Sequence, residues 1–545
     1  MKLNQTQILN AKINSQNQQK NDNNISFKSG ELISALNFLQ TNQAVGATFV
    51  DISCMGAPRT AVDFTRGPEA GIETARREFS STINDALLGA YGVGAAGLLA
   101  IGLNKKYGIE TNKMFVDSDS IKTLAEFWSK NNSKPKTYLK NILDETKVFN
   151  PNNPGCDKEG FVKLDAKTKK EIAERLHTEL QSNKNKKFKQ EKKAFIEMQN
   201  YLKSLLIDSA GTEDGFKIGK CETISSANDY LNNIYKSTKA FMQDKVAETF
   251  VKNGKIEENA FFKGMKKLNA GTAILGVAIC SAIGAAAQPI NMYLTKKKTG
   301  NTGFVGGGEE NKTSKFKLLK AAIATVAGAG MLATIGKPSQ LLKNIQFKGL
   351  IPTIPQFKLA FGITIVSRLL AARNENELRE SSIKDSLAFV NWLILGGFAS
   401  KLAAAGFEKT EAFKNDKLIK YLEKSDVKKK SKPARIFNWL TDSSIVSREE
   451  TLHNSLKKLN IDSFKEIGGK KVAKSFKEIL KTVKEAAKAG KPEAVKTMKK
   501  MRALSYAQIA GYAYSALVLG IGIPKLNIAI TNSVEKKKQQ EKSEM

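Results

Sequence analysis

Long uncharged, apolar stretches alternate along this chain with polar segments that are rich in lysine. The longest stretch covers residues 268–295 and contains 28 residues without a formal charge. As an α-helix rising ~1.5 Å per residue it would be about 42 Å long, whereas the hydrocarbon core of a bilayer is about 30 Å thick. The pattern therefore predicts a helix that can cross a membrane, with lysines at both of its ends.

Two further stretches are long enough to span, and three are marginal. Residues 86–104 contain 19 uncharged positions and residues 503–524 contain 22, against the roughly 20 that a spanning helix needs. Three shorter runs follow one another between them, with 16, nine and 15 uncharged residues, at 321–336, 359–367 and 386–400. These runs predict short spanning helices, or re-entrant and interfacial pieces that pack against the longer ones.

Each long stretch carries small residues at a four-residue spacing, which places them on one face of a helix. In lipid, small side chains let helix backbones approach closely, and packing replaces the hydrophobic drive. We therefore expect these faces to pack against other helices, with Cys280 as a small packing residue that has no redox or metal role. The predicted packing residues are Gly92, Ala96 and Ala100, then Gly276, Cys280 and Gly284, and finally Ala507, Gly511 and Ser515.

The polar segments also have a helical pattern. In the largest, Ile172, Leu176 and Leu180 recur at helical spacing, and strand-like alternation is scarce. The expected fold class is all-α, a multi-pass helical membrane protein with basic helical extramembrane domains. The expected order is a disordered Asn/Gln/Lys-rich N-terminus (1–30) without the apolar run of a cleavable signal peptide, short helices and a loop (31–85), a transmembrane candidate (86–104), a helical soluble domain (105–267), a transmembrane candidate (268–295), a Gly/Lys linker (296–320), short apolar helices in or on the membrane (321–405), a basic helical domain (406–502), a transmembrane candidate (503–524) and a tail (525–545).

Charge adds a preferred partner to this picture. The 545 residues include 87 Lys and Arg against 53 Asp and Glu, a formal net charge of +34 that should attract polyanions. Lipid headgroups are favoured over nucleic acid because the basic runs flank apolar segments, where each cation gains about 1 kcal/mol against an anionic leaflet. We therefore expect a membrane with anionic lipids as the partner, together with protein partners or a homo-oligomer, and we do not expect nucleic acid. The lysines assigned to the membrane surface are Lys266, Lys267, Lys296, Lys297, Lys298, Lys474, Lys477, Lys481 and Lys484.

The last four of these lysines belong to a cationic amphipathic pattern over residues 471–488. Ile479, Leu480 and Val483 share one helical face, and lysines occupy the rest of the surface. Such a helix either closes the core of a small domain or lies on a bilayer. The two alternatives are compatible if the domain itself sits on the membrane.

Signatures of catalysis, metal binding and nucleotide binding are absent from the sequence. His177 and His453 lie in charged helical patterns without neighbouring ligands, and the four cysteines are too scattered for a zinc site or a disulfide framework. Residues 306–313 read GGGEENKT, which misses the phosphate-binding pattern at Asn311 and has no convincing buried strand before it. No catalytic residue, metal ligand or cofactor site is therefore assigned, and a non-enzymatic protein is favoured.

The leading hypothesis is an integral membrane protein whose basic domains bind an anionic membrane face and scaffold lipids or partner proteins. A transport or pore-forming protein is the first alternative, because Pro289 and Pro352 lie where broken helices could line a pathway. Against it, the apolar stretches contain no acidic residue that could carry a proton or cation. A soluble all-α interaction protein that associates with membranes is the second alternative.

Arg368 is the one charge whose position could change this balance. It follows a nine-residue apolar run, so it is either paired inside a helical bundle or located at the membrane interface. Arg373 lies only five residues further along the chain, which favours the interface.

Overall fold

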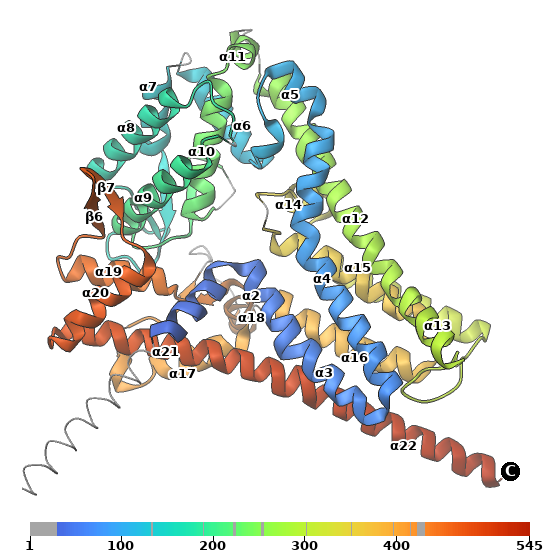
Figure 1. Ribbon diagram of the computed structural model, residues 1–545. Coiled ribbons are helices and arrows are strands. Elements are labelled where there is room, and N and C mark those ends of the chain that lie inside the picture. Colours follow the sequence, from blue (N-terminus) through green and yellow to red (C-terminus); the bar gives the residue numbers. More distant parts are fainter. Residues whose placement is uncertain are drawn as a thin grey trace, which may run out of the picture.

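Helices make up most of the structure, which is a computed structural model of the chain (Figure 1). It describes residues 30–544 apart from 132–133, 189, 222–224, 252–254, 301, 350, 396, 415 and 422–430. The all-α class is confirmed, and the strands within these ranges are short and pair in three small antiparallel sheets. The expectation of a disordered segment over 1–30 falls outside the described residues, except for residue 30.

Four helices in the described ranges are long and apolar enough to cross a membrane. Two bent pairs of helices pass the same test, which raises the number to six if each pair forms one span. The single helices are α12 (Ala260–Thr299), α13 (Ser314–Ala333), α15 (Ile354–Ala371) and the continuous helix that joins α21 (Pro492–Tyr514), η9 (Ser515–Gly522) and α22 (Ile523–Glu544). The bent pairs are α4 (Pro68–Leu99) with α5 (Ile101–Tyr107), at 54°, and α16 (Glu375–Phe389) and η6 (Val390–Ile394) with α17 (Phe398–Glu408), at 50°.

The helical bundle is organised around α4 and α12, which lie side by side along most of their length (Figure 1). Helix α15 packs against α4, α12 and α13, and α16 packs against α15 and α22. The N-terminal segment closes the bundle by packing on α4 and on the π-helical η9. It consists of a helical stretch at 30–41, α2 (Gln43–Phe49), the π-helical η1 (Val50–Gly56), α3 (Ala57–Asp63) and the short η2 (Phe64–Arg66).

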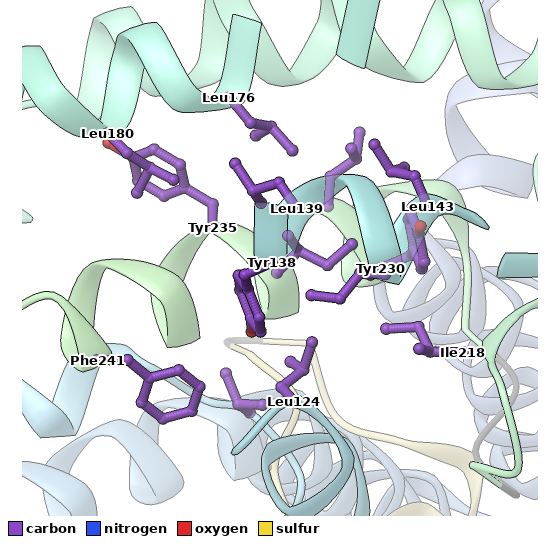
Figure 2. Packing of buried hydrophobic residues seen from close by; sticks show 14 of the residues in the cluster. Leu124, Tyr138, Leu139, Leu143, Leu176, Leu180, Ile218, Tyr230, Tyr235 and Phe241 are labelled. Carbon is purple, nitrogen blue, oxygen red and sulfur yellow. The ribbon is translucent and has the colours of Figure 1, made fainter. Parts of the chain in front are cut away.

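A second unit, inserted between α5 and α12, has an aromatic core of its own. The rings of Trp128 and Tyr138 meet edge to face with centroids 5.1 Å apart, and Phe241 lies 5.7 Å from Trp128. Figure 2 shows Tyr138, Phe241 and the surrounding leucines of this core. The elements are η3 (Thr111–Lys113), α6 (Ser118–Lys130), α7 (Pro135–Asp144), β1 (Thr146–Phe149), β2 (Phe161–Lys163), α8 (Ala166–Ser182), α9 (Lys192–Ala210), β3 (Phe216–Ile218), α10 (Ala227–Phe241), α11 (Asp244–Val251) and η4 (Ile256–Glu258), with β1 in the middle of the sheet.

Local sequence signals explain where several helices of this unit begin. Asp117, Asp165 and Ser226 each precede a helix and accept a hydrogen bond from a backbone amide of its first turn. Such side chains satisfy donors that a helix leaves unpaired at its N-terminus. The helices that the apolar spacing of this polar segment predicts are therefore present, and capping residues mark where they begin.

The C-terminal part of the chain forms a third packed unit around the first half of α21. Its helices α19 (Arg448–Lys458) and α20 (Phe476–Lys488) pack on α21, and α17 packs on the same helix. Other elements in this part and in the preceding linkers are η5 (Pro338–Gln340), α14 (Leu341–Asn344), η7 (Glu411–Phe413), β4 (Ile419–Tyr421), α18 (Lys432–Asp442), β5 (Ser443–Ile445), β6 (Phe464–Ile467) and β7 (Lys470–Ala473).

Polar contacts join this C-terminal unit to α9. Lys203 lies 2.9 Å from Glu449, and Nδ1 of His453 lies 2.9 Å from the Asp208 carboxylate. His453 is buried at this junction, whereas His177 is half-buried on α8. His453 therefore has a structural role between two packed units.

Candidate functional site

Two of the three predicted small-residue faces meet between α4 and α12. A Cβ atom added to Gly276 would lie 3.1 Å from Cα of Gly92 and 2.9 Å from the Phe347 ring. One added to Gly284 would lie 2.5 Å from Oγ1 of Thr364 on α15. Glycine at these positions allows the close approach of the helices. Ala96, Ala100 and Cys280 on the same faces are buried.

The third face packs elsewhere. A Cβ at Gly511 would collide with the side chain of Ser400 on α17. Ala507 is buried and Ser515 is half-buried, with its hydroxyl donating to the Gly511 carbonyl at 3.0 Å. This face therefore serves the contact of α21 with α17 rather than the contact with α4 and α12.

Beside the α4–α12 contact lies a set of charged side chains that we call the buried ion-pair network. At its centre, Nη1 of Arg368 on α15 lies 3.1 Å from Oδ1 of Asp385 on α16, and both side chains are at most 4% exposed. Next to this pair, Glu78 on α4 accepts from Arg59 at 3.1 Å and from Lys384 at 3.3 Å. The network consists of Arg59, Arg66, Glu73, Arg77, Glu78, Arg368, Arg373, Glu377, Glu380, Lys384 and Asp385.

The network continues toward the end of the bundle where α16 begins. Arg373 contacts Glu73 at 2.5 Å and Glu377 at 2.9 Å, and all three side chains are buried. Arg66 forms a two-pronged contact with Glu380, at 2.6 and 2.9 Å. Bidentate contacts of this kind are the strongest that arginine makes with a carboxylate. Together these contacts join η2 and α4 to the start of α16.

Two further carboxylates lie next to the network without a lysine or arginine partner among the described residues. Oδ1 of Asp85 on α4 lies 3.9 Å from Sγ of Cys280, and its Oδ2 has no hydrogen-bond partner. Asp51 of η1 accepts a short hydrogen bond from the Thr82 hydroxyl, one turn before Asp85. Both carboxylates are buried. We call Asp51 and Asp85 the acid pair.

The position of the acid pair along α12 gives its depth in the bundle. The amide of Asn84 donates to the backbone carbonyl of Cys280 at 2.8 Å, so this part of α4 lies level with Cys280. Cys280 is close to the middle of the uncharged stretch 268–295. On α15, the Ser367 hydroxyl donates to the Ala285 carbonyl at 2.7 Å, which places Arg368 near the same level. Charged groups therefore lie midway along the longest apolar stretch.

This arrangement corrects two conclusions from the sequence. Acidic groups do lie at the depth of the apolar stretches, because α4 extends back to Pro68 and carries Asp85 to the level of Cys280. Arg368 is paired with a carboxylate inside the bundle, which is the alternative that the nearby Arg373 did not favour. Burying a charge without a partner is costly, and the partner of Arg368 comes from the neighbouring helix α16.

The end of the network near α22 borders a small space of about 20 Å³. Arg66 and Asn527 are among the residues that line it, and neither Nε of Arg66 nor Oδ1 of Asn527 has a hydrogen-bond partner among the described residues. A loop after α12 lines this space, and the centroid of the Phe304 ring lies 5.4 Å from Cζ of Arg66 and 5.6 Å from Cζ of Arg373. The Asn374 amide holds the loop through the Gly307 carbonyl at 3.1 Å.

The same loop contains the GGGEENKT sequence at 306–313. Among the described elements, the one before this loop is the helix α12 rather than a strand, and α13 begins at Ser314 after the capping residue Thr313. The backbone support that a phosphate-binding loop needs is therefore missing. Its glycines allow a tight turn, since Gly307 and Gly308 have φ values of +132° and +87°.

The lysines assigned to the membrane surface are distributed over several elements. Lys266, Lys267, Lys296, Lys297 and Lys298 are exposed at the two ends of the apolar part of α12, and Lys477 and Lys481 are exposed on α20. Lys474 and Lys484 are half-buried. The apolar face of α20 is buried against α19 and α21. This helix therefore closes the core of a small domain, which is the first of the two alternatives for the amphipathic pattern.

Within the described residues no group of three or more histidine, cysteine, aspartate or glutamate side chains is placed to hold a metal ion. The ionisable groups in the bundle are instead arranged as ion pairs together with the acid pair. Comparisons with protein-family models, with curated proteins and with solved structures find no match for this chain.

Proposed function

We propose that the chain is a multi-pass membrane protein that moves a small ion across the bilayer. The observation that carries the proposal is the depth of the charged groups: Asp85 and the Arg368–Asp385 pair lie midway along the apolar part of α12. Ionisable groups at membrane depth are costly, and where they occur they commonly belong to ion pathways and proton relays. The proposal selects the transport alternative over the scaffold hypothesis.

Exposed apolar side chains support the membrane part of the proposal. Leu318 and Val326 on α13 are 73% and 74% exposed, and Leu98 on α4 is 68% exposed. Ile290 and Tyr293 on α12 are also exposed. A soluble protein rarely exposes large apolar side chains over several adjoining long helices, whereas lipid-facing helices do so by necessity. The exposed lysines at both ends of the apolar part of α12 suit headgroups at the two membrane surfaces.

Irregular helices beside the network support the transport part. η1 and η9 are π-helical and contact one another, and Arg59 donates through Nε to the backbone carbonyl of Leu519 in η9 at 3.3 Å. π-Helical turns are rare and often occur at functional sites. Non-regular backbone at membrane depth is tolerated where protein groups or water satisfy it. An integral membrane protein that acts only as a scaffold, through basic domains on the membrane face, requires neither these turns nor charges inside the bundle.

Ion flux in reconstituted liposomes tests the proposal. The purified full chain is inserted into vesicles that contain anionic lipid, and the fluxes of H⁺, Na⁺, K⁺ and Cl⁻ are followed with trapped dyes under an imposed membrane potential. We expect flux of at least one of these ions above that of protein-free vesicles. Vesicles that carry the inserted protein and remain as tight as protein-free ones contradict the proposal and favour a scaffold.

A further inference from the structure

We propose that the ion moved by this bundle is the proton, and that Asp85, together with Asp51, is the group that carries it through the middle of the bundle. The inference rests on the proposed function and specifies its substrate. It starts from a difference among the buried carboxylates. Glu73, Glu78 and Asp385 each contact a guanidinium or ammonium group, whereas no described lysine or arginine lies within ion-pair distance of the acid pair.

The surroundings of Asp85 leave one of its oxygens open to a proton. Among the described residues Oδ2 has no hydrogen-bond partner, and Oδ1 accepts from the Cys280 thiol at 3.9 Å. An ionised carboxylate in an apolar setting without a counter-ion costs several kcal/mol, and a bound proton removes that cost. A group of this kind takes up a proton at Oδ2 from a hydronium ion, which leaves a water molecule, and later releases the same proton to another water molecule, so one O–H bond forms as another breaks in each step.

The arginines near the acid pair are ion-paired with other carboxylates. Asp51 acts electrostatically on Asp85, so the two carboxylates oppose each other's negative charge. Arg368 on α15 acts on both, but its guanidinium is bonded to Asp385 on α16. The other charged groups that act on Asp51 are Glu78 on α4 and Arg59 on α3, and these two are bonded to each other.

A metal cation suits the acid pair less well than a proton. Calcium takes six to eight oxygen ligands, and magnesium requires near-octahedral coordination. In the part of the chain that the structure describes, no third carboxylate, histidine or cysteine joins the pair in a metal-holding arrangement. The side-chain oxygen of Asn84, the atom that would bind a cation, already accepts a hydrogen bond from the Tyr91 hydroxyl at 3.2 Å. A proton needs only the one free oxygen.

The small space at the end of the network provides a contact with water. Its volume of about 20 Å³ is enough for one water molecule, which needs at least two polar partners. Arg66 and Asn527 line this space, and the Nε–H donor of Arg66 and the Oδ1 acceptor of Asn527 have no hydrogen-bond partner among the described residues. Lys384 borders the same space and donates to Glu78, which precedes Thr82 by one turn on α4, and Thr82 donates to Asp51. Polar groups therefore extend from this space to the acid pair.

Proton flux in liposomes that contain Asp85→Asn tests the inference. The change keeps the shape of the side chain and removes the exchangeable acid, and the flux is driven by a valinomycin-clamped potassium gradient and read with trapped pyranine. We expect wild type to acidify the vesicle interior, D85N to fall to the protein-free rate, and Asp85→Glu to retain flux. Ser281→Ala is the matched control, because Ser281 follows Cys280 and its hydroxyl has no hydrogen-bond partner among the described residues. The control should conduct as wild type does.

Folding of each variant is checked by its circular dichroism and by its elution from a sizing column in detergent. If D85N is folded and conducts protons as well as wild type, or if S281A loses flux to the same extent, the inference is wrong. If wild type conducts Na⁺, K⁺ or Cl⁻ but no protons, the inference fails and the proposed function stands. If wild type conducts no ion at all, both fail.

Discussion

Removal of the guanidinium at the centre of the buried ion-pair network should destabilise the bundle strongly. In Arg368→Met the Asp385 carboxylate, which is 0% exposed, loses the partner that lies 3.1 Å away. Breaking a buried pair by removing one member costs about 3–5 kcal/mol, because the remaining charge stays buried. The lost hydrogen bond from Nη2 to the Arg77 carbonyl, at 3.4 Å, adds at most about 1 kcal/mol.

A double-mutant cycle separates the charge effect from the packing effect. Adding Asp385→Asn removes the uncompensated charge, so the R368M/D385N protein should be more stable than R368M by about 2 kcal/mol or more. The free energy of unfolding is measured by SDS titration in mixed micelles and followed by circular dichroism. Lys481→Met is the matched control: its ion pair with Glu485 is exposed and should contribute less than about 1 kcal/mol. If R368M is as stable as this control, the claim that Arg368 and Asp385 form a buried, stabilising ion pair is refuted.

Three other predictions concern packing, protonation and capping. Gly276→Leu should lower the free energy of unfolding by about 1–3 kcal/mol in the same titration, because the new side chain clashes with Phe347. Gly94→Leu should not lower it in this way, because the space around Gly94 is open. Burial lowers the pKa of Lys236 to about 8 from its ordinary value of 10.5, so between these two values the unfolded chain binds more protons than the folded protein. The free energy of unfolding should therefore rise from pH 8 to 10, and it should rise less steeply in Lys236→Met. Equal slopes in the two proteins would contradict this assignment. Ser475→Ala removes the capping box of α20 and should cost about 1 kcal/mol. The expected sign is roughly fivefold faster hydrogen exchange in the first turn of α20, and unchanged exchange would refute the cap.

The length and apolar character of α12 could be predicted from the sequence alone. Its 28 uncharged residues exceed what a globular core helix needs, and the helix that contains them is 40 residues long. The small-residue spacing also indicated which faces of α4 and α12 could approach closely, and Gly92 and Gly276 lie at that contact. Periodicity is a local property, so it can be read without knowledge of partners.

The buried ion-pair network could be predicted only in part. A search for uncharged stretches stops at Asp85, yet Thr74, Glu78, Thr82 and Asp85 recur at helical spacing and lie on one polar face that leads into the apolar part of α4. That spacing indicates a polar helix face that continues into the apolar part of α4. The partners were not predictable, because Lys384 lies 306 residues from Glu78 and no local pattern specifies which distant helix packs there.

The depth of the charged groups in the membrane is the central claim, and spin labels on the outer face of α12 measure it most directly. Cysteines that replace Ile279 and Ile283, in a chain with Cys156→Ser, mark the level of the acid pair, and cysteines that replace Lys267 and Lys297 mark the two ends. In reconstituted vesicles the ratio of oxygen to nickel-chelate accessibility rises with depth in the bilayer. We expect the highest ratio at 279 and 283 and low ratios at 267 and 297. A uniform, water-like ratio at all four positions would contradict the account.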